Sequence, residues 1–183
     1  NKIFAFFRTF NHICREMAYI PDIANYKPFY IQKDAEGTAI DTTTWGLVAK
    51  SNPFPLLPTP KEPHNNEWLD ENGDDEYLKE MYYESFEFDV DFYIKTLGDN
   101  AESVMRQQID SFFEVIRSGE FMVYDSYTGL GRKNVRYAGY SEGEYKRKTT
   151  GSDKWARAIF TITFKVNDPI TRIIYSGGRL VEA

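Results

Sequence analysis

The most regular pattern in the chain is a ten-residue alternation of apolar and polar side chains at positions 86–95. The apolar members are large and mostly aromatic, and three of the polar members are acidic. A period of two places successive side chains on opposite faces of a strand, so the pattern predicts a β-strand with one buried and one solvated face. The apolar set is Phe86, Phe88, Val90, Phe92 and Ile94, and the polar set is Glu87, Asp89, Asp91, Tyr93 and Lys95.

A second pattern, with steps of three and four residues, predicts an amphipathic helix over about 101–118. Asp99 and Glu102 have the spacing of a capping box, with Asp in place of the usual Ser or Thr. Gly119 stands where a glycine commonly ends a helix. The apolar stripe consists of Ala101, Val104, Met105, Ile109, Phe112, Phe113 and Ile116.

Another alternation predicts a long strand from Lys154 to Val166, ended by Asn167-Asp168-Pro169, since proline cannot donate to a sheet ladder. We expect this strand to pair with the one at Phe86–Ile94, with the helix over their apolar face. Its predicted inner side chains are Ala158, Phe160, Ile162, Phe164 and Val166.

Shorter β-rich segments complete the predicted fold. Residues 139–154 are predicted to be a polar hairpin or loop, and Asn11–Ala18 a short helix. The fold class that follows is mainly β (α+β), an antiparallel β-sandwich or partly closed barrel with one amphipathic helix packed on a sheet. The shorter strands are predicted at Lys27–Gln32, Trp45–Ala49, Glu120–Tyr124, Arg132–Tyr137 and Arg172–Tyr175.

Residues 51–66 contain five prolines and are predicted to form an extended arm with interleaved apolar side chains. The next segment, 67–76, carries six carboxylates around an Asn72-Gly73 turn. We therefore divide the chain into three parts. Residues 1–44 are an N-terminal segment, partly strand and a candidate subunit-contact arm, 45–80 are the proline-rich arm and acidic turn, and 81–183 are the β-sandwich core.

Composition sets few limits on function. A chain of 183 residues with 42% hydrophobic and 16% aromatic residues suits one domain with a full core. Cys14 is the single cysteine, which excludes an intramolecular disulfide. No apolar run approaches the roughly 18 residues that span a bilayer, and the apolar start at Asn1–Arg8 is too short for a signal peptide. Whether residues precede Asn1 is left open.

The net charge of −6 conceals an asymmetry between the two ends of the chain. From Arg106 onward there are 13 basic and 9 acidic residues, against 9 basic and 19 acidic residues before it. Oppositely charged halves suit head-to-tail contacts between copies or docking on a charged partner, although they also serve simply to solvate a surface.

Three candidate chemical sites are weak. Asp70, Asn72 and Asp74 imitate the start of a calcium loop, but Asp75 and Met81 stand where that loop needs Gly and Glu. Glu87, Asp89 and Asp91 lie about 7 Å apart on one strand face, a spacing that also suits two glycosidase carboxylates. His12 and His64, the only histidines, have no neighbours that specify a nucleophile or a metal cluster.

Two further segments are basic. Gly129–Lys133 can attract an anion but lacks the spacing of a phosphate-binding loop, and a turn between strands is the simpler interpretation. A mixture of tyrosines and bases between Tyr137 and Lys154 can bind single-stranded nucleic acid, yet contact with an acidic patch of another subunit suits this acidic chain better. The mixture consists of Tyr137, Tyr140, Tyr145, Lys146, Arg147, Lys148 and Lys154.

Taken together, residues 45–169 resemble bacteriophage tail structural proteins, in particular the β-sandwich domain of distal tail (baseplate hub) proteins. The resemblance lies in an aromatic alternating strand, a Gly-Asp break, an amphipathic helix and the segments FMVYDSYTGLGRKNVRYAGY and FTITFKVNDP. WGLVAKSNPFPLLPTPKE and EWLDENGDDEYLKE are similar to tail proteins of phages and prophages of Bacteroides-type bacteria.

This resemblance implies a non-enzymatic structural subunit of the virion tail, made in the host cytoplasm, with no cofactor, metal or membrane contact. It implies a closed ring, a hexamer or another cyclic oligomer, that contacts other tail proteins. The alternatives are a tail-tube, tail-terminator or neck protein, a carbohydrate-binding module that uses Trp68 and Trp155, and a hydrolase that uses Asp89.

Overall fold

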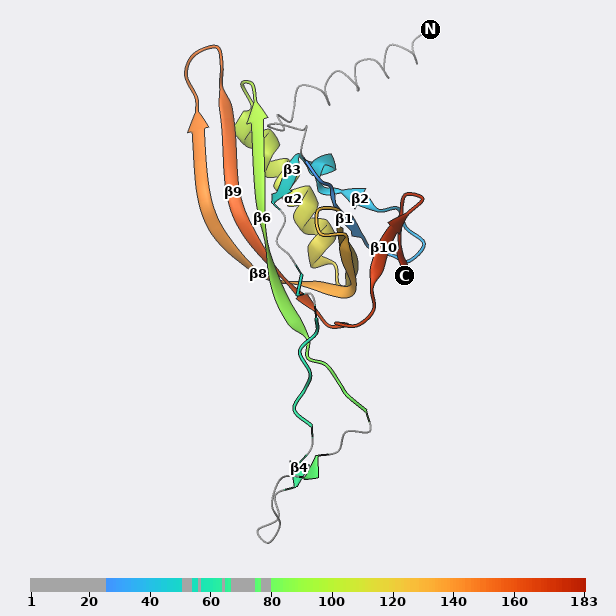
Figure 1. Ribbon diagram of the computed structural model, residues 1–183. Coiled ribbons are helices and arrows are strands. Elements are labelled where there is room, and N and C mark those ends of the chain that lie inside the picture. Colours follow the sequence, from blue (N-terminus) through green and yellow to red (C-terminus); the bar gives the residue numbers. More distant parts are fainter. Residues whose placement is uncertain (1–25, 51–53, 56, 64, 67–74, 77–79) are drawn as a thin grey trace.

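The fold is a strongly bent antiparallel sheet with one helix on its concave side (Figure 1). The computed structural model describes residues 26–50, 54–55, 57–63, 65–66, 75–76 and 80–183. The predicted helix at Asn11–Ala18 and Cys14 lie outside these residues.

Seven strands form the main sheet, in the order β2-β1-β7-β8-β9-β6-β3, with every neighbouring pair antiparallel. β2 and β3 end the sheet without meeting, so the predicted mainly β fold with one packed helix is confirmed and the barrel is open. The strands are β1 (Phe29–Gln32), β2 (Ile40–Asp41), β3 (Leu47–Lys50), β6 (Phe86–Leu97), β7 (Phe121–Asp125), β8 (Leu130–Lys148) and β9 (Trp155–Val166).

Smaller elements surround the sheet. A 3-10 helix, η2 (Thr42–Trp45), leads into β3, and the helix α2 (Ala101–Arg117) follows β6. Two hairpins are separate from the main sheet, β4 (Asn65–Asn66) with β5 (Asp75–Glu76), and β10 (Ile173–Ser176) with β11 (Arg179–Glu182).

β6 and β9 pair in the way the sequence predicts. Their register joins Phe88 to Phe164 and Phe92 to Phe160, so aromatic side chains from both strands lie together on one face. The five predicted inner side chains of β9 are all buried. Each apolar residue on β6 therefore lies opposite another apolar residue, which is the unit of sheet stabilisation.

β8 is longer than the sequence predicts and makes the sheet bend. Its first residues, Leu130–Val135, pair with β7, and the strand then pairs with β9 as far as Lys148. Of the two alternatives predicted for 139–154, the hairpin is confirmed and the loop is wrong, because β8 continues to Lys148 and pairs with β9 across the turn at 149–154. The bend brings Phe29 of β1 within ring-centroid distances of 6.2 Å from Phe92 and 6.5 Å from Phe164.

Helix α2 packs its apolar stripe on the concave side of this sheet. The ring of Phe112 lies 5.2 Å from that of Phe92 and 5.5 Å from that of Trp45. Gly119 has φ +104°, a left-handed conformation that glycine adopts freely, as the sequence predicts for the end of the helix. The predicted capping box is wrong, since Asn100 is the N-cap and its side chain makes no capping hydrogen bond.

A buried glutamine attaches the C-terminal hairpin to β1. Gln32 is fully buried, and its Nε2 donates to the carbonyl oxygens of Asp34, Ala35 and Leu180. Its Oε1 accepts a hydrogen bond from the Leu180 N–H at 2.6 Å. The side chain thus fixes β11 beside β1 without leaving a buried polar group unpaired.

We expect Phe92→Ala to lower the free energy of unfolding by about 3–5 kcal/mol, because Phe92 is completely buried among aromatic rings from β1, α2 and β9. Leu57→Ala is the control, since this side chain is 78% exposed, and should change stability by no more than about 0.5 kcal/mol. Urea unfolding followed by circular dichroism measures both. Equal stability of the two variants would contradict the packing described.

Candidate interaction surface

One edge of the sheet is open along most of β8. β7 covers this edge only from Leu130 to Val135, and residues 136–148 pair with β9 on the opposite side. Among the described strands, none pairs with the free edge of 136–148. A long exposed edge presents unpaired backbone N–H and C=O groups and is a template for an added strand.

A groove of about 340 Å³ runs beside this edge, between α2 and the inner face of β8 and β9. Met105, Ala158 and Phe160 contribute apolar side chains to it, and Tyr140 and Tyr145 flank them. Tyr140 is 56% exposed and Tyr145 42% exposed, so neither is covered by the chain itself. The groove therefore combines apolar side chains with exposed aromatic rings, a composition found at protein interfaces.

Cations outnumber carboxylates around the end of this groove. Glu102 of α2 accepts hydrogen bonds from Arg147 of β8 and from Arg106. Glu144 is in turn shared by Lys146 and Arg157. Glu142 also lines the groove, so the four cations Arg106, Lys146, Arg147 and Arg157 stand against three carboxylates.

These hydrogen bonds lower the pKa of the Glu102 carboxyl group. The bond from Arg147, followed by that from Arg106, lowers the pKa of this carboxyl group from 4.5 to about 2. The ion pairs of Glu102 therefore persist at any pH at which its carboxyl group would ordinarily be charged.

The described part of the proline-rich segment forms an arm that projects from the opposite end of the molecule (Figure 1). We use "the arm" for residues 54–55, 57–63 and 80–85. Its two sides are joined by hydrogen bonds from the Lys61 N–H to the Tyr82 carbonyl and from the Glu84 N–H to the Thr59 carbonyl, both 2.8 Å long. The arm is therefore a two-stranded ribbon.

The arm is fixed at its base and exposed beyond it. Phe54 is 2% exposed, with its ring 4.5 Å from that of Phe88 and the Arg132 guanidinium 5.9 Å from its own ring centroid. Further along, Leu57 is 78%, Met81 60% and Tyr82 64% exposed. Large apolar side chains along a ribbon that makes so little core of its own are typical of a segment that binds a partner.

Two carboxylates on the acidic face of β6 accept hydrogen bonds from threonines of β9. The hydroxyl of Thr161 donates to Asp91 at 2.7 Å, and that of Thr163 donates to Asp89 at 2.6 Å. Glu87, Asp89 and Asp91 lie side by side along one strand, so no two of them face each other across a gap. This arrangement does not favour the paired-carboxylate chemistry considered from the sequence.

Of the two tryptophans proposed for glycan binding, Trp155 already contacts cations of its own chain. Trp155 is half-buried, with the Lys95 ammonium 5.9 Å and the Arg157 guanidinium 5.7 Å from its ring centroid. On another surface, Tyr30 and Tyr175 stack on each other with centroids 4.4 Å apart, and burial raises the pKa of Tyr30 to about 12. Trp68 lies outside the described residues.

The segment Gly129–Lys133 joins the turn after β7 to the start of β8. Its Gly131 allows two neighbouring backbone segments to approach closely. A Cβ on Gly131 would lie 2.7 Å from the carbonyl oxygens of Val123 and Ile173, which leaves no space there for an anion. Arg132 is buried and donates to the Gly131 carbonyl. Asp125 closes the turn by accepting hydrogen bonds from the backbone of Tyr127 and Thr128.

The other candidate sites are not brought together. His12, His64 and the calcium-like residues Asp70, Asn72 and Asp74 lie outside the described residues, whereas Asp75 belongs to β5. The described residues contain no group of three or more metal-ligating side chains. No helix in the described part of the chain is long and apolar enough to cross a bilayer.

The groove and the open edge were not predicted from the sequence, although the residues that form them stand out as a mixture of tyrosines and bases. The tyrosines and bases at 137–154 are the correct residues, but the sequence pattern left a hairpin and a loop as alternatives and did not show that the first strand has a free edge. Their pairing partner, β9, lies on the other side of a turn, and the bulges between Tyr137 and Gly139 and between Glu142 and Glu144 disturb the period of two.

Comparison with known proteins finds a similarity among solved structures. No family model and no curated protein matches the chain. A solved structure that it resembles is the SPP1 Dit (gp 19.1) protein, described as a paradigm of the hub adsorption apparatus in phages that infect Gram-positive bacteria. The TM-score is 0.47 and the identity 14%, over 80% of this chain and 52% of that one, so this chain spans about half of that structure.

This neighbour is described as a phage hub protein. A Bacteroides-type origin is not tested by it. Because the identity and the TM-score are this low, the likeness says nothing about the groove, the arm or the open edge.

We expect the Glu102 carboxyl carbon to titrate in NMR with a midpoint near pH 2. Because the folded pKa lies below the ordinary value of 4.5, the pairs stabilise the contact between α2 and β8 above that value. This stabilisation is lost as the pH falls through about 2.

Replacing both partners, with Arg106→Gln and Arg147→Gln, should return the midpoint towards 4.5. Arg117→Gln is the matched control, because Arg117 pairs with Glu114 and does not contact Glu102. A midpoint that stays near 2 without the two arginines would contradict the assignment of the shift.

Proposed function

We propose that this chain is a structural subunit of a phage tail or baseplate that assembles with copies of itself into a closed ring. It joins other tail components through protein–protein contacts and has no catalytic role. The phage-tail part of the proposal rests on the sequence resemblance over residues 45–169. The assembly part rests on the arm and on the open edge of β8.

The observation that carries the assembly function is the exposed arm. Leu57, Met81 and Tyr82 are each at least 60% exposed on a ribbon whose base is held by the packing of Phe54 on Phe88. A free two-stranded ribbon is marginally stable in water, so contact with another protein supplies the burial that the chain itself does not.

The open edge supports the same function. Proteins that act as monomers usually cover, shorten or interrupt their sheet edges, because exposed edges pair with other chains. Residues 136–148 of β8 remain an edge over most of a long strand, beside a groove with exposed tyrosines. An edge of this length is consistent with a subunit that functions in an assembly.

The proposed location is the tail of the virion, with assembly in the host cytoplasm. A hexamer or another cyclic oligomer is the form we propose, with other tail proteins bound along the ring axis. The arm and the open edge would equally suit a tail-tube, tail-terminator or neck subunit, which are the alternative positions in the tail. The occupied face of Trp155 does not favour the carbohydrate-binding alternative.

We expect purified protein to form closed cyclic oligomers in a concentration-dependent manner. Mass photometry and negative-stain microscopy measure the subunit number and the shape of the particles. A protein that stays monomeric at high micromolar concentration, and that binds none of the proteins encoded beside it, would contradict the proposed function.

A further inference from the structure

We propose that the arm of one copy docks on the open edge of β8, and on the groove beside it, in a second copy. This inference rests on the proposed assembly function and names the two surfaces that meet. The arm supplies acidic and apolar side chains, and the β8–β9 hairpin supplies cations, aromatic rings and an unpaired strand edge.

Charge is the first argument for this pairing. The arm contains three acidic residues, Glu62, Glu80 and Glu84, and one lysine, whereas residues 146–157 contain five basic residues and one acidic residue. Lys146, Lys148 and Lys154 already pair with exposed carboxylates of their own chain. Exposed pairs of this kind contribute little, so they can be exchanged for carboxylates of a second copy at small cost.

Backbone geometry is the second argument. Residues 80–85 contain no proline, unlike the other side of the arm. Tyr82 and Glu84 make the hydrogen bonds to that other side, and neighbouring residues of a strand point their N–H and C=O groups in opposite directions. The backbone of Met81 and Tyr83 therefore faces outward, and it can pair with the free edge of β8.

Apolar complementarity is the third argument. Met81 and Tyr82 expose large side chains on opposite faces of the arm, so one of them faces the groove beside β8, where Tyr140 and Tyr145 are exposed over apolar neighbours. A strand added to a sheet edge commonly places alternate side chains in such a groove, which adds specificity to the backbone hydrogen bonds.

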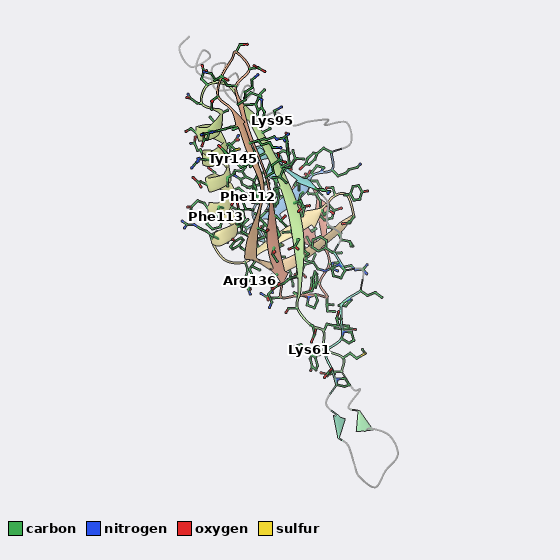
Figure 2. All side chains as sticks on the ribbon, turned by 90° about the vertical axis from the view of Figure 1, so that its left-hand side faces the viewer. Lys61, Lys95, Phe112, Phe113, Arg136 and Tyr145 are labelled. Carbon is green, nitrogen blue, oxygen red and sulfur yellow. The ribbon has the colours of Figure 1, made fainter. Side chains whose placement is uncertain are left out.

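The positions of the two surfaces make the contact heterologous. Figure 2 shows Lys61 on the arm below the body and Tyr145 in the upper half of the body. Contact between two different surfaces joins copies head to tail, and the growing chain of copies keeps one free arm at one end and one free edge at the other until it closes. This geometry gives a ring when the rotation between copies closes.

Two charge-reversal variants test the contact. The arm variant carries Glu62→Lys, Glu80→Lys and Glu84→Lys, and the hairpin variant carries Lys146→Glu, Lys148→Glu and Lys154→Glu. We expect each variant alone to self-associate at least about tenfold more weakly than the unmodified protein in sedimentation velocity, because each contact then opposes like charges. The control variant, with Lys27→Glu, Arg117→Glu and Arg179→Glu, changes three exposed cations outside the hairpin and should assemble normally.

Mixing the two variants gives the sharper result. The unmodified arm of the hairpin variant fits the unmodified hairpin of the arm variant, and the reversed arm fits the reversed hairpin. The mixture should therefore form assemblies in which the two variants alternate, although neither variant assembles alone. A chain carrying all six changes reverses both surfaces and should recover part of its assembly. Thermal unfolding and near-ultraviolet circular dichroism establish that every variant is folded.

The outcomes separate this inference from the proposed function. If the unmodified protein forms rings and both variants form them equally well, the arm and β8 do not meet, although the protein is still a ring subunit. The same conclusion follows if folded variants lose assembly but their mixture gives no mixed assembly. If the unmodified protein stays monomeric, both the inference and the proposed function are overturned.

Discussion

The pairing of β6 with β9 is the interaction on which the rest of this structure depends. Twelve residues of each strand are in register, and their inner faces form a continuous layer of large apolar side chains. Helix α2 packs on this layer through Phe112, and β1 reaches it from the far end of the sheet through Phe29. Without this layer neither the helix nor the outer half of the sheet would have a surface to bury.

The length of β8 leaves one edge of the sheet unpaired. One part of β8 pairs with β7 and carries the sheet around the core, and the rest extends beyond β7 with only β9 beside it. The open edge, the groove and the cationic cluster all result from this single difference in strand length. The surface proposed for assembly is therefore a direct extension of the fold.

The sequence predicted those parts of the fold whose side chains alternate cleanly. The strand at Phe86–Ile94, its pairing with Phe160–Val166 and the covering helix all follow from strong local periodicity, and the structure confirms them. β8 carries Gly139 and Gly143, two bulges and mostly polar residues beyond Tyr137, so its extent depends on pairing with a distant strand. The capping box failed for a similar reason, because Asp99 and Glu102 bind Lys154, Arg106 and Arg147 in place of the helix N-terminus.

The attachment of the arm has a mechanical consequence. The arm continues directly into β6, and the ring of Phe54 packs on Phe88 of the same strand. A pull on the arm would act along the axis of β6 and load its hydrogen bonds to β9 in shear, all at once. Peeling the strands apart would break these bonds one at a time and needs less force. A subunit held by its neighbours through this arm would thus transmit tension into the most strongly paired part of its own sheet.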